Sequence, residues 1–431
     1  MATDLQRGFG SVLANRAFRA LWTSQALSQT AQNSINFMQM VLIEHITGSS
    51  THLGLMILAF TLPGVVVSPI AGVVVDRLSR KWVLIASNAL RVVLTLGYFL
   101  VLGRLEGWPL LLAIYIIAFT ASAVGQFFSP AEAASIPALV GLHNLVTANS
   151  LFNLTLAISQ VAGLIILGPL AVKLIGVRGG FVLVAFMYVG ATYAVSLIPR
   201  DAPRGSSEGR GGWERAASEL KEGWSFVLHT RDVALAMSHL TLVATLIMIL
   251  ATLAPGFAAR VLGMAPEDAV LVFAPAGVGM LLVTGALGRW GYRLRKDLFS
   301  HLALGIASLC FAALGLVSQF LQSHRLRLAS PTTGVGTEWL LMVVGLSLVM
   351  GATLSAATIL AQTIVQEQTP AALRGRVFAV QFMLSNLVGI PPMLTLAGLA
   401  DWLGIPPILL GVSGIALLAT ASSAYLRYRR S

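Results

Sequence analysis

The chain has 431 residues, of which 56% are hydrophobic and only 10% are charged, with a mean hydropathy of +0.83. A soluble domain carries roughly a quarter charged residues, so this composition excludes an ordinary soluble protein and indicates one that lies in lipid. The net charge of +11 would suit a nucleic-acid-binding protein if it were clustered on one soluble face. It is instead spread over the short segments between hydrophobic runs, so we expect no nucleic-acid partner.

Twelve apolar or amphipathic runs follow one another along the chain, each long enough for a helix that crosses the roughly 30 Å hydrocarbon core of a bilayer. Inside hydrocarbon every backbone N–H and C=O group must be paired within the protein, so helices are expected for these runs. We predict an all-α integral membrane protein with twelve transmembrane helices in two pseudo-symmetric six-helix bundles. The runs lie at 20–46, 53–75, 83–104, 109–129, 146–174, 179–199, 233–260, 268–290, 298–322, 339–366, 377–400 and 405–427.

Lys and Arg residues are distributed unevenly between the two sets of loops that alternate along twelve spans. Twenty-one of the 28 lie with the two termini in one set, six lie in the other, and Arg91 lies inside a run. Basic loops stay on the cytoplasmic side of a membrane. We therefore expect both termini in the cytoplasm and the protein in the inner or plasma membrane.

The first run is unusually polar, and its amide side chains recur at steps of four and three residues, which places them on one face of a helix. The stripe either lines a water-filled cavity and contacts substrate or joins packed helices through hydrogen bonds. Five amides exceed what packing needs, which favours the cavity. The stripe consists of Gln25, Gln29, Gln32, Asn36 and Gln39, and further amides that are candidates for the same cavity are Gln126, Asn153, Gln362 and Gln381.

The segment GVVVDRLSRK, residues 72–81, is a tight basic loop between the second and third runs. Gly72 allows two helices to approach closely, and Asp76 can lie against the positive end of a neighbouring helix. Arg77, Arg80 and Lys81 can bind anionic lipid headgroups. The alternative is a basic loop that only fixes the topology.

Few charges fall within the runs. Arg91 lies ten residues past Lys81, roughly 15 Å into the third span, where an unpaired charge is unfavourable by several kcal/mol. It attracts an anionic substrate group or tunes a proton site, or else it forms a structural ion pair with Asp76 or Glu132, which we slightly favour. Glu44, followed by His45 at the end of the first run, is a further candidate for proton coupling, although a solvated helix end is the favoured interpretation.

The longest polar stretch, residues 200–232, is predicted to be a cytoplasmic linker between an N-terminal bundle at 1–199 and a C-terminal bundle at 233–431. Apolar side chains recur in its second part at helical spacing, which predicts an amphipathic helix at the membrane surface. A disordered tether is the alternative. The apolar positions are Trp213, Ala217, Leu220, Trp224 and Val227.

Motifs of several enzyme classes are absent from the sequence. No lysine follows a glycine as a P-loop requires, and neither a zinc-binding helix motif nor a nucleophile elbow occurs. The seven histidines are scattered rather than spaced as metal ligands, and the single cysteine, Cys310, excludes a cysteine-based metal cluster. We expect no catalytic residues, no cofactor and no metal, and an ion or solute gradient as the source of energy.

The loop at 72–81 resembles the signature loop of the major facilitator superfamily. Four further segments resemble its drug- and siderophore-exporting branch: NRAFRALWTSQALSQ, FFSPAEAASIPALVGLHNLVTANSL, LKEGWSFVL and QEQTPAALRGRVFAV. The resemblance implies that Asp76 pairs with the start of the eleventh helix, near Arg374 and Arg376, and locks the two halves together on the cytoplasmic side. The equivalent loop of the second half carries Arg289 in place of the aspartate, which implies that a second lock is degraded or absent.

The resemblance also implies a function as a secondary transporter that works by alternating access. We favour proton-coupled efflux of an amphiphilic drug, macrolide or siderophore, because amides without a fixed charge constellation suit a weakly specified cargo. The alternatives are a facilitator or importer, including a lysophospholipid flippase, and, in another class, a non-transporting receptor or scaffold. The expected partners are a small-molecule substrate, membrane lipid and protons, and the protein is expected to be a monomer.

Overall fold

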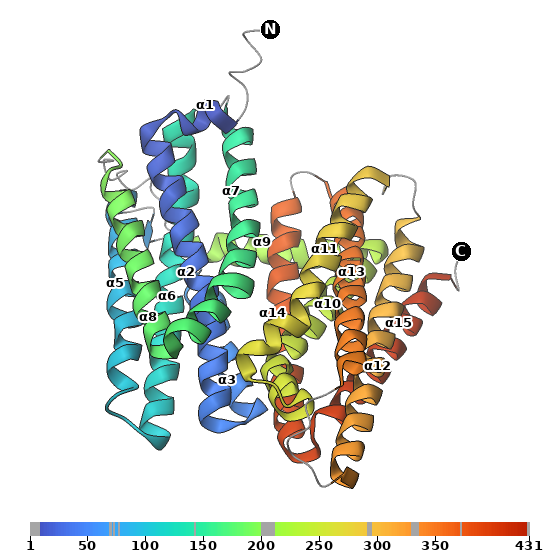
Figure 1. Ribbon diagram of the computed structural model, residues 1–431. Coiled ribbons are helices and arrows are strands. Elements are labelled where there is room, and N and C mark those ends of the chain that lie inside the picture. The colour runs from blue at the N-terminus through green and yellow to red at the C-terminus, as the bar shows by residue number, and fades with distance from the viewer. Residues whose placement is uncertain are drawn as a thin grey trace. The chain divides into compact units, whose positions relative to one another are not determined.

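Helices make up the regular structure of the described chain. The computed structural model describes residues 9–68, 71, 74–75, 78–141, 144–199, 212–290, 295–328, 336–370 and 373–428, and within these ranges there are helices and turns but no strand (Figure 1). The all-α class predicted from the hydrophobic runs is confirmed.

The first half of the chain begins with a short helix that leads directly into the polar first span. Asn15 separates the two, and its Oδ1 atom accepts hydrogen bonds from the backbone N–H groups of Ala17 at 3.0 Å and Phe18 at 3.2 Å, as an N-cap does. The elements of this half are α1 (Phe9–Leu13), α2 (Arg16–Thr47), α3 (Ser50–Val66), α5 (Arg80–Val101), α6 (Gly107–Val140), α7 (Leu145–Gln160), the π-helix η3 (Val161–Leu167) and α8 (Gly168–Ser196).

The second half begins with the helix predicted in the linker. The side chains of Leu220 and Val227 pack into an apolar core with Val233 and Val377, so this amphipathic helix covers other helices. The elements are α9 (Gly212–His229), α10 (Arg231–Gly256), the π-helix η4 (Phe257–Leu262), the 3₁₀ helix η5 (Pro266–Asp268), α11 (Ala269–Trp290), α12 (Lys296–Leu328), α13 (Thr337–Gln368), α14 (Arg374–Leu403) and α15 (Ile405–Tyr428).

The two halves share a glycine turn between their last two spans. Gly176, at φ 71° and ψ 169°, interrupts α8 and separates the fifth predicted span from the sixth. Gly404, at φ 87° and ψ 166°, separates α14 from α15 in the same way. Residues with a Cβ atom rarely adopt this backbone conformation. The matching turns agree with the pseudo-symmetry predicted for the two six-helix bundles.

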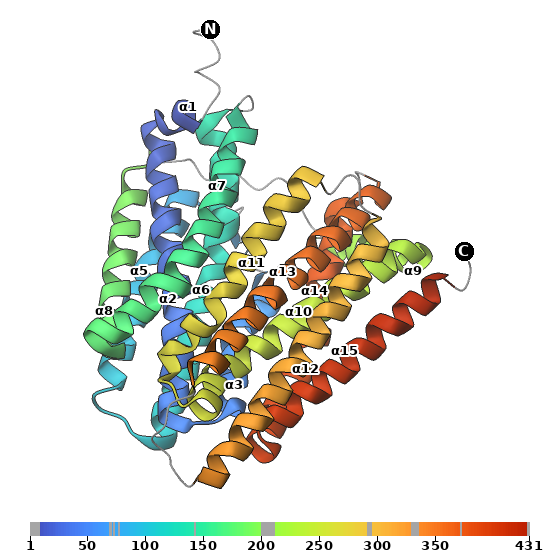
Figure 2. The same cartoon turned by 45° about the vertical axis from the view of Figure 1, so that its right-hand side comes forward.

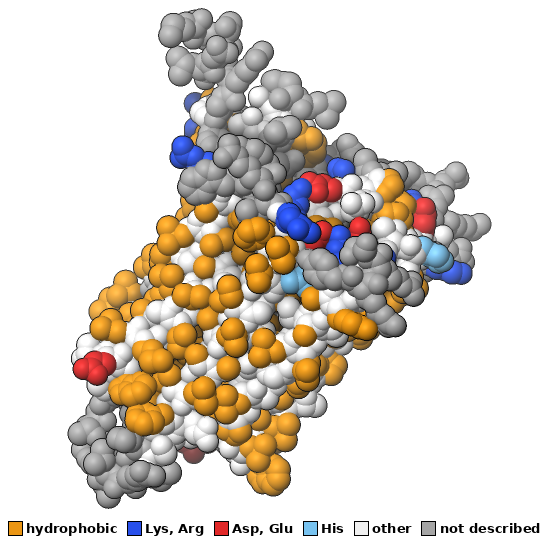
Figure 3. All heavy atoms as spheres, turned by 90° about the vertical axis from the view of Figure 1, so that its right-hand side faces the viewer, with side chains coloured by type: hydrophobic (Ala, Val, Ile, Leu, Met, Phe, Trp, Pro, Cys, Tyr) orange, Lys and Arg blue, Asp and Glu red, His pale blue; other side chains and the backbone are white. Residues whose placement is uncertain are grey.

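The described helices account for the twelve predicted spans. Nine of them are long and apolar enough to cross a membrane, and one of these, Thr147–Ser196, is 50 residues long and holds both the fifth and the sixth span. The other two predicted spans are α2 and α3. Amide side chains make α2 more polar than these nine helices, and α3 is shorter, with 17 residues. Hydrophobic side chains cover the body of the face shown in Figure 3, and most of the charged ones gather at one end of it.

The chain divides into two compact units. Unit 1 consists of Met1–Ile43 and Leu55–Arg210, and unit 2 consists of Glu44–Gly54 and Gly211–Ser431. In unit 1 the apolar core includes Phe18 and Phe152, whose ring centroids lie 5.6 Å apart. The division at 210/211 falls inside the predicted linker, whereas the α2–α3 turn, residues 44–54, belongs to unit 2.

Candidate functional site

The amide stripe of α2 is divided by burial. Gln25 and Gln39, at its two ends, are 1% and 2% exposed, and the Gln39 Nε2 atom donates a hydrogen bond of 2.8 Å to the hydroxyl of Tyr98 on α5. Gln29, Gln32 and Asn36 are only half-buried. Gln39 therefore joins packed helices, while the middle of the stripe keeps a partly accessible polar surface on unit 1.

Gln32 is held in place at both ends of its amide. Its Nε2 atom donates to Asn36 Oδ1 at 2.9 Å, and its Oε1 atom accepts a hydrogen bond of 3.2 Å from the hydroxyl of Tyr188 on α8. Tyr188 is 1% exposed, so its hydroxyl depends on this acceptor within the described structure. The sequence analysis did not single out Tyr188, because nothing in the surrounding apolar run marks its partner.

Arg91 lies in a buried aromatic setting. The side chain is 7% exposed, and its guanidinium carbon lies 5.6 Å from the ring centroids of both Phe128 and Tyr188, which is a cation–π arrangement. Gly125 on α6 leaves space for the guanidinium, since a Cβ atom at this position would collide with Arg91 Nη2. Tyr188 thus contacts both Arg91 and the α2 amides.

Glu132 is the acidic residue of this region. It lies on α6, is 7% exposed, and interacts electrostatically with Arg91. The two side chains form no direct ion pair in the described structure, so the pair with Glu132 favoured from the sequence is not found. Neither Glu132 Oε1 nor Arg91 Nε has a hydrogen-bond partner within the described residues. Buried charged groups without complete hydrogen bonding are unfavourable for stability and are common where a group must exchange a proton or a ligand.

Arg80 and Lys81 of the basic loop bind backbone carbonyls of α6 and of the end of α8. Arg80 Nη1 donates to the backbone carbonyl of Ala134 at 2.6 Å. Lys81 Nζ donates to the carbonyls of Ser196 at 2.7 Å and Ile198 at 2.5 Å, at the C-terminal end of α8, where a cation is favourable. Three other residues predicted for the lock lie outside the described residues: Gly72, Asp76 and Arg77.

The region predicted to receive Asp76 is engaged by the linker helix. Arg376, near the start of α14, forms an ion pair with Glu222 of α9. Arg374 Nε donates to the backbone carbonyl of Thr369 at 3.2 Å. The start of α14 is therefore tied to α9 within unit 2.

The scattered amides have different surroundings. In unit 1, Gln126 is half-buried with a 3.4 Å hydrogen bond to the Ser122 carbonyl, and Asn153 is exposed. In unit 2, Gln362 is half-buried, and Gln381 Nε2 donates to Ser385 Oγ at 3.2 Å. Their assignment to a substrate cavity stays a prediction.

A polar cluster surrounds Asp401 at the end of α14. The carboxylate accepts hydrogen bonds from the hydroxyls of Ser49 and Thr51, both at 2.6 Å, and from the backbone N–H groups of Ser50 at 2.6 Å and Thr51 at 2.8 Å. Arg260 Nη1 donates to it at 3.2 Å. The Asp401 carboxylate thus caps the N-terminus of α3, where an anion is favourable.

Glu44 belongs to the same polar cluster. It is 5% exposed, and its Oε1 atom lies 3.6 Å from Arg260 Nε, so the solvated helix end expected for Glu44 is wrong. Its neighbour His45 is exposed and lies 3.3 Å from Glu267. We call Glu44, Ser49, Ser50, Thr51, Arg260 and Asp401 the Asp401 cluster.

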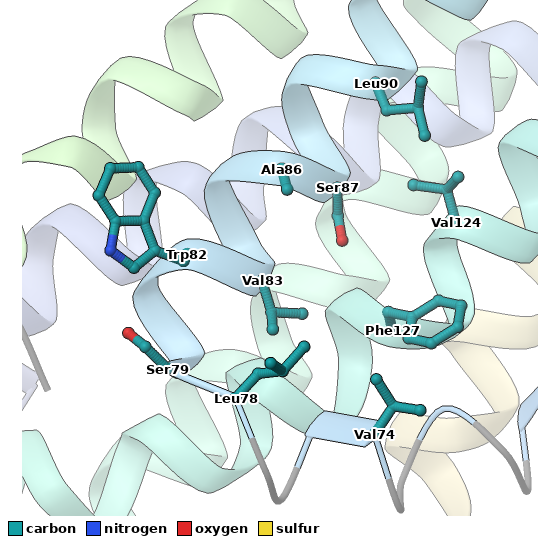
Figure 4. Close-up of a pocket in the computed structure, with 10 residues that line it drawn as sticks. All are labelled: Val74, Leu78, Ser79, Trp82, Val83, Ala86, Ser87, Leu90, Val124 and Phe127. Atoms are coloured by element: carbon teal, nitrogen blue, oxygen red, sulfur yellow. The ribbon is translucent and has the colours of Figure 1, made fainter. Parts of the chain in front are cut away.

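A cavity of about 530 Å³ lies along α5 and α6 on the surface of unit 1 (Figure 4). Its lining is apolar and includes Trp82, Leu90 and Phe127, and the first two are 56% and 44% exposed. It contains none of the amides or charged residues predicted to contact cargo. Its chemistry suits lipid chains rather than a polar substrate.

Long apolar helices that enclose buried amides and charges define a polytopic membrane protein of the kind that moves solutes. A family model described as Major Facilitator Superfamily matches residues 21–391. The chain belongs to the major facilitator superfamily, whose members are transporters, and the family predicted from the sequence motifs is confirmed.

Similar proteins and structures agree with this family. The chain is 26% identical over 370 residues to the enterobactin exporter EntS of Escherichia coli, covering 84% of this chain and 80% of the relative. It is 24% identical over 361 residues to the uncharacterized MFS-type transporter YfiS of Bacillus subtilis, covering 83% of this chain and 80% of that relative. Among solved structures, the nucleoside transporter NupG superposes with a TM-score of 0.70 at 13% identity, covering 96% of this chain and 99% of that structure. A bacterial homologue of the iron transporter ferroportin in an inward-facing state also has a TM-score of 0.70, at 14% identity, covering 95% of this chain and 98% of that structure.

Proposed function

We propose that this protein is a secondary active exporter of amphiphilic small molecules, driven by protons. The observation that supports it best is the connected polar group in unit 1, in which Tyr188 contacts both Gln32 of the α2 stripe and the buried Arg91. Amides offer donors and acceptors without a fixed charge, which suits cargo of varied structure. The similarity to enterobactin exporters supports export of a drug, macrolide or siderophore.

In this proposal the half-buried amides contact the cargo and Glu132 carries the coupling proton. A carboxylate that interacts electrostatically with a buried arginine changes that interaction whenever it gains or loses a proton. Tyr188 would transmit the change at Arg91 to Gln32, since its side chain contacts both Arg91 and Gln32. The energy comes from the proton gradient through alternating access.

Transport by inside-out membrane vesicles tests the direction and the coupling. With an acidic lumen, we expect the vesicles to accumulate enterobactin, erythromycin or ethidium, and a protonophore should abolish the accumulation. Movement that needs no gradient would favour a facilitator, and uptake only by right-side-out vesicles would favour an importer. Flipping of a fluorescent lysophospholipid alone would favour a flippase, and no movement of any probe would favour a receptor or scaffold.

Substitution of the α2 amides separates cargo contact from packing. The half-buried Gln29 side chain makes no hydrogen bond to the described residues, so Gln29→Leu should leave folding nearly normal and change the apparent affinity for individual probes by about fivefold, the equivalent of ~1 kcal/mol. Gln32→Leu removes the acceptor of the buried Tyr188 hydroxyl and should also lower thermal stability. Equal loss of folded protein in both variants would show that the middle of the stripe is packing alone.

Accessibility labelling tests the proposed location, with both termini in the cytoplasm of the inner or plasma membrane. Cys310 is buried, so a variant with Cys310→Ser provides a background for single introduced cysteines. With Ser218→Cys in α9 we expect reaction with a membrane-impermeant maleimide only from the cytoplasmic side, and with Glu106→Cys before α6 only from outside; both positions are exposed. The reverse pattern, or labelling of both from one side, would contradict the proposed topology.

A further inference from the structure

Two of the seven histidines meet in the interior of unit 2, although the sequence shows no pairing. His239 on α10 and His301 on α12 are 4% and 8% exposed, and their ring centroids lie 4.4 Å apart in an edge-to-face arrangement. Ser423 on α15, which is 6% exposed, lies against both rings. Figures 1 and 2 show α12 and α15 side by side.

Four hydrogen bonds run through these side chains. His301 Nδ1 lies 2.7 Å from the backbone carbonyl oxygen of Asp297, and His301 Nε2 lies 3.2 Å from Ser423 Oγ. His239 Nε2 lies 2.9 Å from the same Ser423 Oγ, and His239 Nδ1 lies 2.9 Å from Ser300 Oγ. Both nitrogens of both rings are therefore engaged.

The carbonyl oxygen at one end fixes every hydrogen along this chain of bonds. A carbonyl only accepts, so His301 Nδ1 carries a hydrogen, and in a neutral ring His301 Nε2 is then an acceptor. The Ser423 hydroxyl must donate to that nitrogen, which leaves the Ser423 oxygen to accept from His239 Nε2–H. His239 Nδ1 is then bare and accepts from the Ser300 hydroxyl. With both rings neutral, all four bonds are made and point the same way.

The nearest ion-paired group to this chain of bonds is a triad from α10, α12 and α15. Arg427 of α15 lies 2.5 Å from Asp232 of α10 and 2.7 Å from Asp297 of α12, so this triad has one positive and two negative groups and a net charge of −1. Lys296 of α12 is paired with Glu367 of α13. Among the described residues, four further ionisable groups at the ends of these segments are exposed: His229, Arg231, Arg295 and Tyr425. Arg427 is thus paired with two carboxylates, so the triad presents no unpaired positive charge to the two rings.

We propose that His239, Ser423 and His301 form a proton-binding site of unit 2 that holds one proton for the two histidines. An added proton on His301 Nε2 removes the acceptor of the Ser423 hydroxyl, which must turn away while its oxygen accepts from both rings. Two imidazolium rings at 4.4 Å repel each other, so a second proton is excluded. A role in coupling, as a second proton site in addition to Glu132 of unit 1, rests on the proposed function. Proton binding by the two histidines does not.

Nitrogen NMR of the full-length protein in nanodiscs, with ¹⁵N-labelled histidine and no cargo or gradient, tests the site directly. At about pH 8 we expect hydrogen on His301 Nδ1 and on His239 Nε2, with the other two nitrogens bare. Between about pH 8 and about pH 5, imidazolium signal should grow to half of the combined intensity of the two residues. Spectra of His239→Gln and His301→Gln assign the signals.

Ser423→Ala supplies the second readout. It should break the chain of bonds between the rings, so that the tautomer of His239 is no longer fixed, whereas the Asp297 carbonyl still holds the hydrogen on His301 Nδ1. Ser422→Ala is the matched control, since Ser422 is exposed and, among the described residues, bonds only the Ala419 carbonyl at 2.9 Å. The proposal would be overturned by any of four results. These are the opposite tautomers, no imidazolium at about pH 5, two imidazoliums from the pair, and identical behaviour of the two serine variants. Since no transport is measured, failed export in vesicles leaves this test unaffected.

Discussion

Replacing Asp401 by alanine is expected to lower the free energy of unfolding of unit 2 by about 3 kcal/mol, because one carboxylate accepts five hydrogen bonds. One hydrogen bond to a charged group contributes about 1.5–3 kcal/mol. The five bonds to Asp401 share two oxygens, and the Asp401 side chain is 26% exposed, so their contributions do not add up. Asp401→Asn keeps one acceptor oxygen and should be about half as damaging.

Thermal unfolding in nanodiscs and amide hydrogen exchange measure these effects. The backbone N–H groups of Ser50 and Thr51 bond to Asp401, so their exchange should accelerate in both variants. Glu367→Gln is the control, since Glu367 forms a half-exposed ion pair with Lys296 and should contribute at most about 1 kcal/mol. Unchanged exchange at Ser50 and Thr51 would show that the carboxylate does not cap α3.

The helices follow from the sequence because their formation depends on local hydropathy. All twelve predicted runs correspond to helical segments, and the break between 174 and 179 coincides with Gly176. The amphipathic helix in the linker was also predicted from spacing alone. Its packing onto α10 and α14 was not, because the same apolar face fits a membrane surface or another helix equally well.

The contacts of the polar residues depend on which helices meet, and this is why sequence spacing identified candidates without their partners. Arg91 was found from its depth in a span, but its contacts with Phe128 and Tyr188 come from two other helices. His239 and His301 are 62 positions apart in the chain, so no ligand spacing marks them. A charge at the end of a span also fits either a solvated or a buried position. Glu44 was expected to be solvated and is buried.

A double substitution of Arg91 and Glu132 is expected to be more stable than either single one while remaining inactive in proton-driven transport. Arg91→Met leaves the buried Glu132 carboxylate without a nearby positive charge. Glu132→Gln leaves the buried Arg91 guanidinium without a nearby negative charge. Losing one partner of a buried ion pair lowers stability by about 3–5 kcal/mol. Arg91 and Glu132 interact electrostatically without a hydrogen bond between them, so we expect a smaller loss in each single variant and a still smaller one when both are replaced by neutral residues of similar size. The yield and thermal stability of Arg91→Met/Glu132→Gln should therefore approach those of the wild type.

Transport by the double variant separates the two roles that the sequence left open for Arg91. If the pair only stabilises unit 1, the stable double variant will accumulate ethidium under a proton gradient as the wild type does. If Glu132 carries the coupling proton, the folded double variant will lose gradient-driven accumulation while still exchanging cargo down its own gradient, since cargo contact and proton binding lie on different side chains. Tyr188 contacts both groups, so Tyr188→Phe should weaken coupling without abolishing it, because it removes the hydroxyl that binds Gln32 and keeps the ring beside Arg91.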